Sequence, residues 1–175
     1  RRPVPGQRER ARTLFMLAGD ALCACRLEWT MPLAVEILGE VHRGALHAAL
    51  VLGDPRPNGG IDSETLTLTL TTPTETVSSS GRSGWFEDEL LELAAALSER
   101  ARIRSCLTCA HSDYHPAGHG LFGGLACFRD VEDDYSRVVD KPGIFAIWDR
   151  RTEFVQETFL CPQYRLRRPG AGYRG

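Results

Sequence analysis

Apolar and polar residues alternate in several segments of the first half of the chain, a pattern typical of strands. In residues 64–72, leucines occupy every second position and threonines lie between them, so one face of the predicted strand is apolar. Residues 13–18 and 21–30 are rich in apolar side chains and flank a Gly-Asp turn, which predicts a β-hairpin. A further short strand is expected over residues 33–38.

A helical pattern replaces this alternation in residues 85–100, where apolar side chains fall on one stripe of an amphipathic helix. Glu87, Asp88 and Glu89 put negative charge where the amino terminus of a helix favours it. Residues 40–52 are apolar but too few to reveal a period, so they fit a strand and a short helix equally.

The composition is that of a soluble globular protein. The chain has 175 residues, of which 42% are hydrophobic and 25% are charged, and this is enough for one domain with a sizeable core. No apolar run is long enough to span a membrane, and no apolar segment of a signal peptide follows the first basic residues. We therefore expect a cytoplasmic protein that does not enter a membrane.

The net charge of −2 hides two basic ends. Residues 1–12 contain five arginines and one acid, and residues 161–175 contain four arginines and no acid. Nucleic-acid-binding proteins usually carry a basic face on the folded body itself, so solvated tails are the simpler interpretation. Nucleic-acid binding through the arginine-rich ends is kept as an alternative.

Four of the six cysteines are spaced in a way typical of metal sites. Cys106 and Cys109 form a C-x2-C knuckle, in which two thiolates converge on one ion as half of a tetrahedral zinc site. Cys127 and Cys161 supply the other half, provided that the fold brings them to the knuckle. The sequence therefore predicts Zn2+ held by these four cysteines.

Other roles of the cysteines stay open at this point. Four thiolates also ligate iron–sulfur clusters, although this spacing matches neither common ferredoxin pattern. Disulfides do not suit a cytoplasmic protein, and a redox pair at the C-x2-C knuckle lacks the expected βαβ context. The remaining cysteines, Cys23 and Cys25, lie two apart in a predicted strand and are expected to pack in the core.

The loop between the second and third of these four cysteines is rich in histidine and glycine. Its histidines recur every four residues, but the proline and glycines between them argue against a helix with a metal-binding face. The expected arrangement is a surface loop that presents Asp113, Tyr114 and His115. A formal G-x-G-x-x-G at residues 118–123 follows a polar stretch rather than a strand, so it does not indicate a dinucleotide site.

A series of short motifs carries a family resemblance. The motifs are Cys106-x2-Cys109, Ser112-Asp113-Tyr114-x-Pro116-x-Gly118, Phe122-Gly123, Cys127-Phe128-Arg129, Gln156-Glu157-Thr158-x-Leu160-Cys161 and Gly172-Tyr173-Arg174-Gly175. In this order they resemble a bacterial family of small Cys-rich proteins known only as a domain of unknown function. The resemblance covers about residues 84–175, and residues 1–83 match only loosely. It implies no activity, and a metal at the four cysteines is an inference for the family as much as for this chain.

Together these features predict an α+β fold. An antiparallel, β-rich amino-terminal part with one packed amphipathic helix is followed by a zinc-ribbon-like four-cysteine module. Residues 1–12 form a basic tail, residues 13–100 the sheet and helix, and residues 101–175 the cysteine module with its arginine-rich end, within one continuous domain. In that module a short helix is expected over residues 130–139, and strands over residues 144–148 and 154–160.

A closed site of four thiolates leaves no coordination position for water, so the predicted zinc is structural. We therefore expect an interaction or regulatory module with an unidentified protein partner, rather than an enzyme. The candidate contact residues are Asp113, Tyr114, His115, Arg165, Arg167 and Arg168. The alternative is a metalloenzyme with an open three-cysteine site, in which Asp113, His115 or Glu157 acts as the general base.

Overall fold

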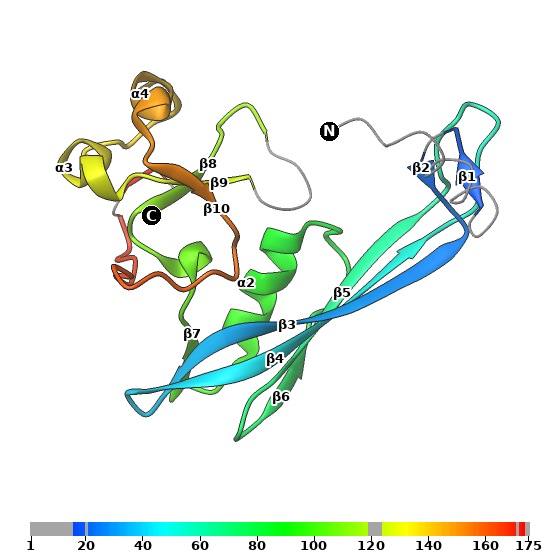
Figure 1. The fold of residues 1–175 in the computed structure, drawn as a ribbon, viewed down its shortest axis with the longest axis horizontal. Coiled ribbons are helices and arrows are strands. Elements are labelled where there is room, and N and C mark those ends of the chain that lie inside the picture. Colours follow the sequence, from blue (N-terminus) through cyan, green and yellow to red (C-terminus); the bar gives the residue numbers. More distant parts are fainter. Residues whose placement is uncertain (1–15, 20, 119–123, 171, 174–175) are drawn as a thin grey trace.

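The computed structural model describes residues 16–19, 21–118, 124–170 and 172–173, and its largest element is a twisted antiparallel sheet (Figure 1). The sheet has five strands in the order β6-β5-β4-β3-β7. These strands are β3 (Cys25–Ile37), β4 (Glu40–Leu52), β5 (Glu64–Thr71), β6 (Thr76–Ser78) and β7 (Ala101–Ile103). The alternating leucines of residues 64–72 therefore lie in a strand, as predicted.

A tight turn joins the two longest strands. Leu38 and Gly39 both have positive φ angles, of 53° and 90°, as a two-residue turn of this hand requires. The turn pairs β3 with β4 along their full length. Residues 40–52 are thus a strand, and the two strands expected over residues 21–30 and 33–38 are largely one, because Pro32 lies within β3 without ending it.

A small hairpin precedes the main sheet. Strands β1 (Leu17–Ala18) and β2 (Ala21–Leu22) pair antiparallel around Gly19, where the sequence predicted a hairpin. Cys23 lies between β2 and β3 rather than within a strand, and it is fully buried, whereas Cys25 is half-buried at the start of β3.

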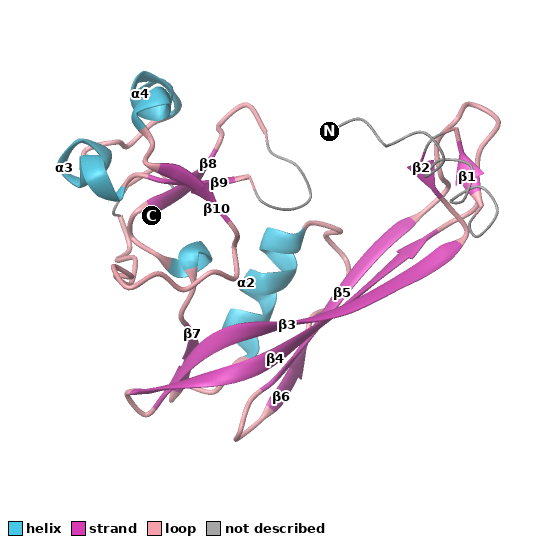
Figure 2. Ribbon diagram, in the orientation of Figure 1, coloured by secondary structure: helices cyan, strands magenta, loops and turns pink. Residues whose placement is uncertain are grey.

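Helix α2 (Phe86–Ala96) lies across one face of the sheet (Figure 2), which confirms the predicted amphipathic helix. Its buried residues Leu90 and Leu93 join the inward leucines of β5 and the inward residues of β3 in one apolar cluster. Glu89 is buried on the same helix, where its carboxylate accepts hydrogen bonds from the backbone N–H groups of Gly81 and Ser83. These bonds satisfy a charged group that burial alone would penalise.

The carboxy-terminal part contains a second, three-stranded sheet in the order β10-β9-β8. Its strands are β8 (Ser112–Tyr114), β9 (Leu125–Cys127) and β10 (Glu153–Val155). The short helices around them are η1 (Cys106–Thr108), η2 (Arg129–Val131), α3 (Glu132–Tyr135), α4 (Lys141–Ile147) and η3 (Trp148–Arg150).

Two sequence expectations in this part are wrong. Residues 144–148 lie in α4 and the start of η3 instead of a strand, because Asp140 caps α4 by accepting a hydrogen bond from the Gly143 N–H and a proline stands in the first turn. The strand expected over residues 154–160 ends at Val155, and the following residues form turns. The short helix expected over residues 130–139 is present in reduced form as η2 and α3.

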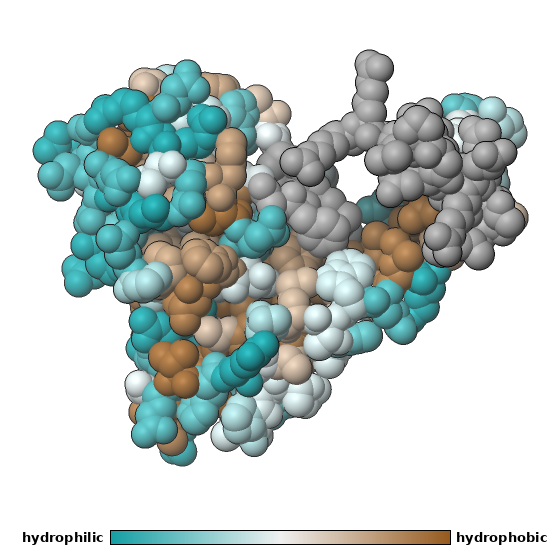
Figure 3. All heavy atoms as spheres, viewed as in Figure 1, coloured by the Kyte–Doolittle hydropathy of each residue, from teal (hydrophilic) through white to brown (hydrophobic). Residues whose placement is uncertain are grey.

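One apolar cluster connects the two sheets. Tyr114, Leu125 and Val155 from the second sheet belong to the same buried cluster as the inward residues of β3 and α2. The architecture is therefore α+β, with the carboxy-terminal part packed onto the main sheet and helix (Figures 1 and 2). No helix among the described residues is long and apolar enough to cross a membrane. On the face shown in Figure 3, apolar surface gathers in the middle of the molecule, between the carboxy-terminal part and the sheet.

Candidate metal centre

The knuckle between Cys106 and Cys109 is a single turn of 3-10 helix, η1. Ser105 precedes the turn and its N–H donates to the Thr108 hydroxyl over 3.4 Å, while the Cys109 N–H donates to the Cys106 carbonyl over 3.2 Å. Two cysteines at the ends of so short a turn are held close together. The local sequence is sufficient to form this half of the predicted site.

Backbone hydrogen bonds bring the other two cysteines to the knuckle. The Cys106 N–H donates to the carbonyl of Phe159 over 2.6 Å, two residues before Cys161. On the other side, Ser112 in β8 is the direct antiparallel partner of Cys127 in β9. The structure therefore gathers Cys106, Cys109, Cys127 and Cys161 from three separate segments, although two of them are far from the knuckle in sequence.

The four side chains are unpaired thiols, and three of them are buried while Cys161 is half-buried. Burial, and to a lesser extent the neighbouring Cys109, Cys161 and Cys127, raise the pKa of Cys106 to about 12. Cys106 therefore lies near each of the other three thiols. Within the described part of the chain, however, no three His, Cys, Asp or Glu side chains are arranged as they stand to hold a metal ion, so the predicted zinc-ribbon-like module is not shown.

Positive charge lies beside this cysteine cluster. Arg129 places its Nη1 3.6 Å from the Sγ of Cys127 and also pairs with Glu153. Burial raises the pKa of Cys127, while hydrogen bonding and charge from Arg129 oppose the increase. The guanidinium therefore favours the thiolate form of Cys127.

His111 is a buried histidine near three arginines, of which Arg129 also contacts Cys127. Burial lowers its pKa, and Arg165, Arg167 and Arg129 lower it further, so the ring is held in its neutral form. Its Nδ1 makes no hydrogen bond and lies 3.8 Å from the Glu132 carboxylate. His115, in contrast, packs edge-on against Phe145 and Trp148.

The expected surface position of Asp113 and Tyr114 is wrong. Both are buried in β8, where the Tyr114 hydroxyl donates to Glu157 over 3.0 Å and Asp113 accepts from the Tyr135 hydroxyl over 2.9 Å. Glu157 is itself buried, in a turn after β10 rather than in the predicted strand. These carboxylates hold the carboxy-terminal part together and do not face solvent.

The arginines of the carboxy-terminal segment differ in role. Arg167 is half-buried and donates to the Tyr135 hydroxyl and to the carbonyls of Cys109 and Ser112. Arg165 pairs with Glu132, whereas Arg168 is exposed. The basic residues 1–12 and the G-x-G-x-x-G motif beyond residue 118 lie outside the described residues.

Comparison with known families places the chain in one of them. The model of a family of unknown function, DUF6304, matches residues 3–112. The chain belongs to DUF6304. No curated protein and no solved structure matches it.

The DUF6304 match differs in extent from the resemblance drawn from the motifs. It covers the amino-terminal sheet, α2 and the C-x2-C knuckle, where only a loose likeness was expected before residue 84, and it ends before Cys127 and Cys161. The motifs from Asp113 onward thus lie beyond the matched part of this DUF6304 chain. The matched part therefore includes Cys106 and Cys109 and ends before the second pair of cysteines.

Sequence reasoning missed several residues around the centre of this DUF6304 chain. Arg129 was noted only within a family motif and His111 only within the histidine-rich loop, and Tyr135 follows an acidic run that indicates a solvated helix face. The adjacent Cys127-Phe128-Arg129 motif was the available signal for Arg129, because a cation next to a thiolate lowers the thiol pKa.

Proposed function

We propose that Cys106, Cys109, Cys127 and Cys161 bind one zinc ion, and that the protein acts as an interaction module in which this zinc is structural. The supporting observation is that backbone hydrogen bonds and strand pairing bring three cysteine-bearing segments close together, with Cys161 half-buried and the other three thiols buried. Cysteine side chains have a single rotatable bond before the sulfur, so the proposal requires the four neighbouring thiols to turn toward a shared ion by changes of rotamer.

Charge supports the same proposal. Four thiolates and one Zn2+ carry a net charge of −2, and buried negative charge needs positive neighbours. Arg129 supplies one at Cys127, and a bound cation would reverse the effect of burial on the Cys106 thiol by deprotonating it. An iron–sulfur cluster would use the same four thiolates, so metal analysis must separate the two groups.

Binding is favoured over catalysis by the state of the candidate bases. Asp113 and Glu157 are each almost completely buried, and each accepts a hydrogen bond from a tyrosine hydroxyl. A general base has to reach the substrate proton directly or through one water. The described positions of these carboxylates suit a structural role.

The direct test is elemental analysis of the purified chain. We expect one equivalent of zinc per chain, and Cys161→Ser should reduce this zinc content and lower the thermal midpoint. Cys25→Ser is the matched control, because Cys25 is half-buried at the distant start of β3 and should leave zinc content unchanged. Iron with visible absorption, or no metal, would overturn the zinc proposal, and a folded Cys161→Ser chain that keeps its zinc would favour the open site.

A further inference from the structure

Along most of its length, one edge of β3, one of the two longest strands, pairs with no described strand. Its register with β4 and the alternation of antiparallel hydrogen bonds direct the backbone groups of odd-numbered residues to β4 and those of even-numbered residues to the opposite edge. On that edge β7 pairs with residues 35–37 alone, and the Arg104 N–H donates to the Ala34 carbonyl. Among the described strands, none pairs with the outward groups of Arg26, Glu28 and Thr30.

Pro32 explains why β7 stops where it does. In the register of β7 with β3, the next pair beyond Ala34 would involve Pro32, which has no N–H to donate. The chain leaves the edge at Ser105 and enters η1. Beyond Pro32 the regular edge resumes at Thr30, so the line of β7 continues as a track with which no described strand pairs.

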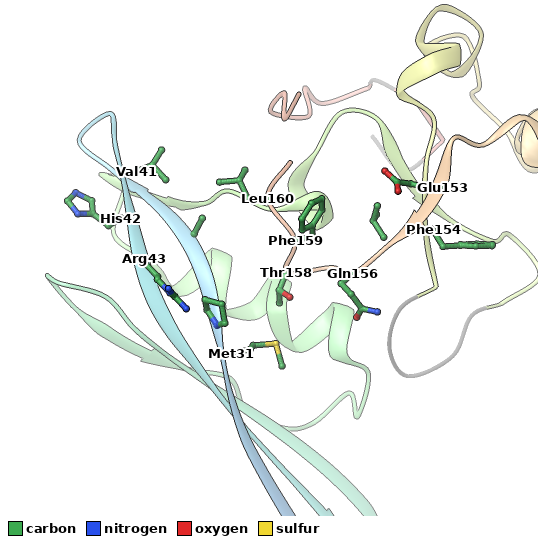
Figure 4. Close-up of a pocket in the computed structure, with 13 residues that line it drawn as sticks. Met31, Val41, His42, Arg43, Glu153, Phe154, Gln156, Thr158, Phe159 and Leu160 are labelled. Carbon is green, nitrogen blue, oxygen red and sulfur yellow. The ribbon is translucent and has the colours of Figure 1, made fainter. Parts of the chain in front are cut away.

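A groove meets this track at its Met31–Pro32 end (Figure 4). It has a volume of about 670 Å³ and lies between the Met31–Ala34 edge and the segment of residues 153–160. A second hollow of about 390 Å³ shares Met31 with it and is lined by Trp29 and Phe86. Together they form a slot that has apolar residues along its floor and the open backbone of β3 at its side.

Charge marks one end of the slot. Arg43 lines the groove, is exposed, and makes no ion pair with any described residue. Nearby charges are already matched, because Glu36 pairs with Arg102 and Glu153 pairs with Arg129. The slot therefore offers one uncompensated cation to a ligand.

The two faces of the sheet favour a ligand in which different kinds of side chain alternate. Trp29 and Met31 lie on the face of β3 that meets the core, whereas Arg43 is the cross-strand partner of Ala34 and lies on the opposite face. A strand added to the β3 edge would direct alternate side chains to these two faces. Apolar residues would face Trp29 and Met31, and an acidic residue opposite Pro32 would lie on the same face as Arg43, toward which it would extend.

We propose that this slot binds an extended peptide segment of a partner protein, which adds to the free edge of β3 as a strand and places an acidic side chain beside Arg43. The open track from Arg26 to Pro32 accommodates about six residues, or about 20 Å of extended chain. Main-chain hydrogen bonds would provide affinity and the alternating side chains selectivity, as in other cases of strand addition. The proposal deepens the interaction role proposed above and does not depend on which metal the cysteines hold.

The test is selection from a library of short random peptides displayed on phage, with the purified full chain as bait. We expect enriched peptides that alternate apolar residues with others and carry Asp or Glu on the alternate face. Synthetic copies methylated on the backbone nitrogens of one alternate set should lose binding at least about tenfold, while methylation of the other set is tolerated. Failure to enrich any peptide, or equal sensitivity to both methylation sets, would overturn the proposal.

Two variants locate the site. Thr30→Pro removes one outward N–H and should weaken the selected peptides at least about tenfold, whereas Thr30→Ala keeps that N–H and the affinity. Arg43→Glu should shift the selection from acidic to basic peptides, and Arg137→Glu, an equal charge change at an exposed arginine outside the slot, should not. Unchanged binding in both Thr30→Pro and Arg43→Glu would overturn the proposal.

Light scattering completes the test. If the chain is a dimer and Thr30→Pro converts it to a monomer, the edge binds a second copy of the chain. That result would overturn the peptide proposal. Zinc content is measured on the same preparation, so peptide capture without zinc would refute only the metal proposal, and zinc without peptide capture would refute only this one.

Discussion

The tyrosine at position 135 is the point at which the buried polar groups of the carboxy-terminal part meet. Its hydroxyl lies 2.9 Å from Asp113 and 3.1 Å from the Ser112 carbonyl, and it accepts a hydrogen bond from Arg167 over 3.0 Å. Burial raises the pKa of Tyr135, so the hydroxyl stays protonated and can donate to the carboxylate. Tyr135→Phe removes this hydroxyl alone.

The expected loss of stability follows from the partners left behind. The ring of residue 135 keeps its stacked contact with Phe128, at 5.0 Å between centroids, so packing is preserved. Arg167 retains the carbonyls of Cys109 and Ser112 as acceptors, but Asp113 loses a short bond while buried. A hydrogen bond to a buried charge contributes about 1.5–3 kcal/mol, and we expect a total loss of about 3 kcal/mol.

Urea titration followed by tryptophan fluorescence measures this loss. With an m-value of about 2 kcal/mol/M, a loss of about 3 kcal/mol lowers the midpoint by about 1.5 M. Tyr173→Phe is the control, because Tyr173 packs against the apolar cluster that contains Phe128 and Tyr135. Its hydroxyl has no hydrogen bond among the described residues. A change in Tyr135→Phe no larger than that of the control would show that the network contributes little and refute the reasoning.

Three further variants probe other parts of the fold. Leu68→Ala empties a fully buried position of β5 and should cost about 3 kcal/mol in urea titration. Gly172→Ala should cost about 1–2 kcal/mol in the same assay, because Gly172 has a φ of 73° and an added Cβ would meet the ring of Tyr135 at 2.7 Å. The hydrogen bond from Arg102 holds the pKa of Glu36 below its ordinary value of 4.5. This pair therefore stabilises the fold above that pH and the contribution is lost on acidification, so Glu36→Gln should flatten the fall of the thermal midpoint with decreasing pH.

Strict periodicity was the reliable guide to the fold. The leucine–threonine alternation of β5 and the apolar stripe of α2 each admit one period, and both elements are present. The apolar run of residues 144–148 admits several, and its helix depends on the cap at Asp140, a local signal that the strand interpretation overlooked. Two strands were expected on either side of Pro32, yet β3 continues through it. A proline whose missing N–H points to a free edge removes no hydrogen bond from the sheet.

The candidate site was likewise predictable only where local sequence determines it. The C-x2-C knuckle follows from local sequence, but the approach of Cys127 and Cys161 depends on the pairing of β8 with β9 and on the turn after β10. Burial of Asp113 was hidden because a three-residue strand shows no alternation that separates an inner from an outer face. The slot beside β3 was also beyond prediction, since it arises from the register of β7 rather than from any motif.

The cysteine cluster and the slot share one segment of the chain. Residues 156–160 form a wall of the slot, and this wall is fastened to η1 by the Cys106 N–H bond to Phe159 and the Leu107 N–H bond to Glu157. Cys161 follows the wall directly, so an ion held by Cys106 and Cys161 would fix the carboxy-terminal end of the wall to η1. On this view the metal is structural for a specific reason, because it holds rigid the surface that faces the open edge of β3.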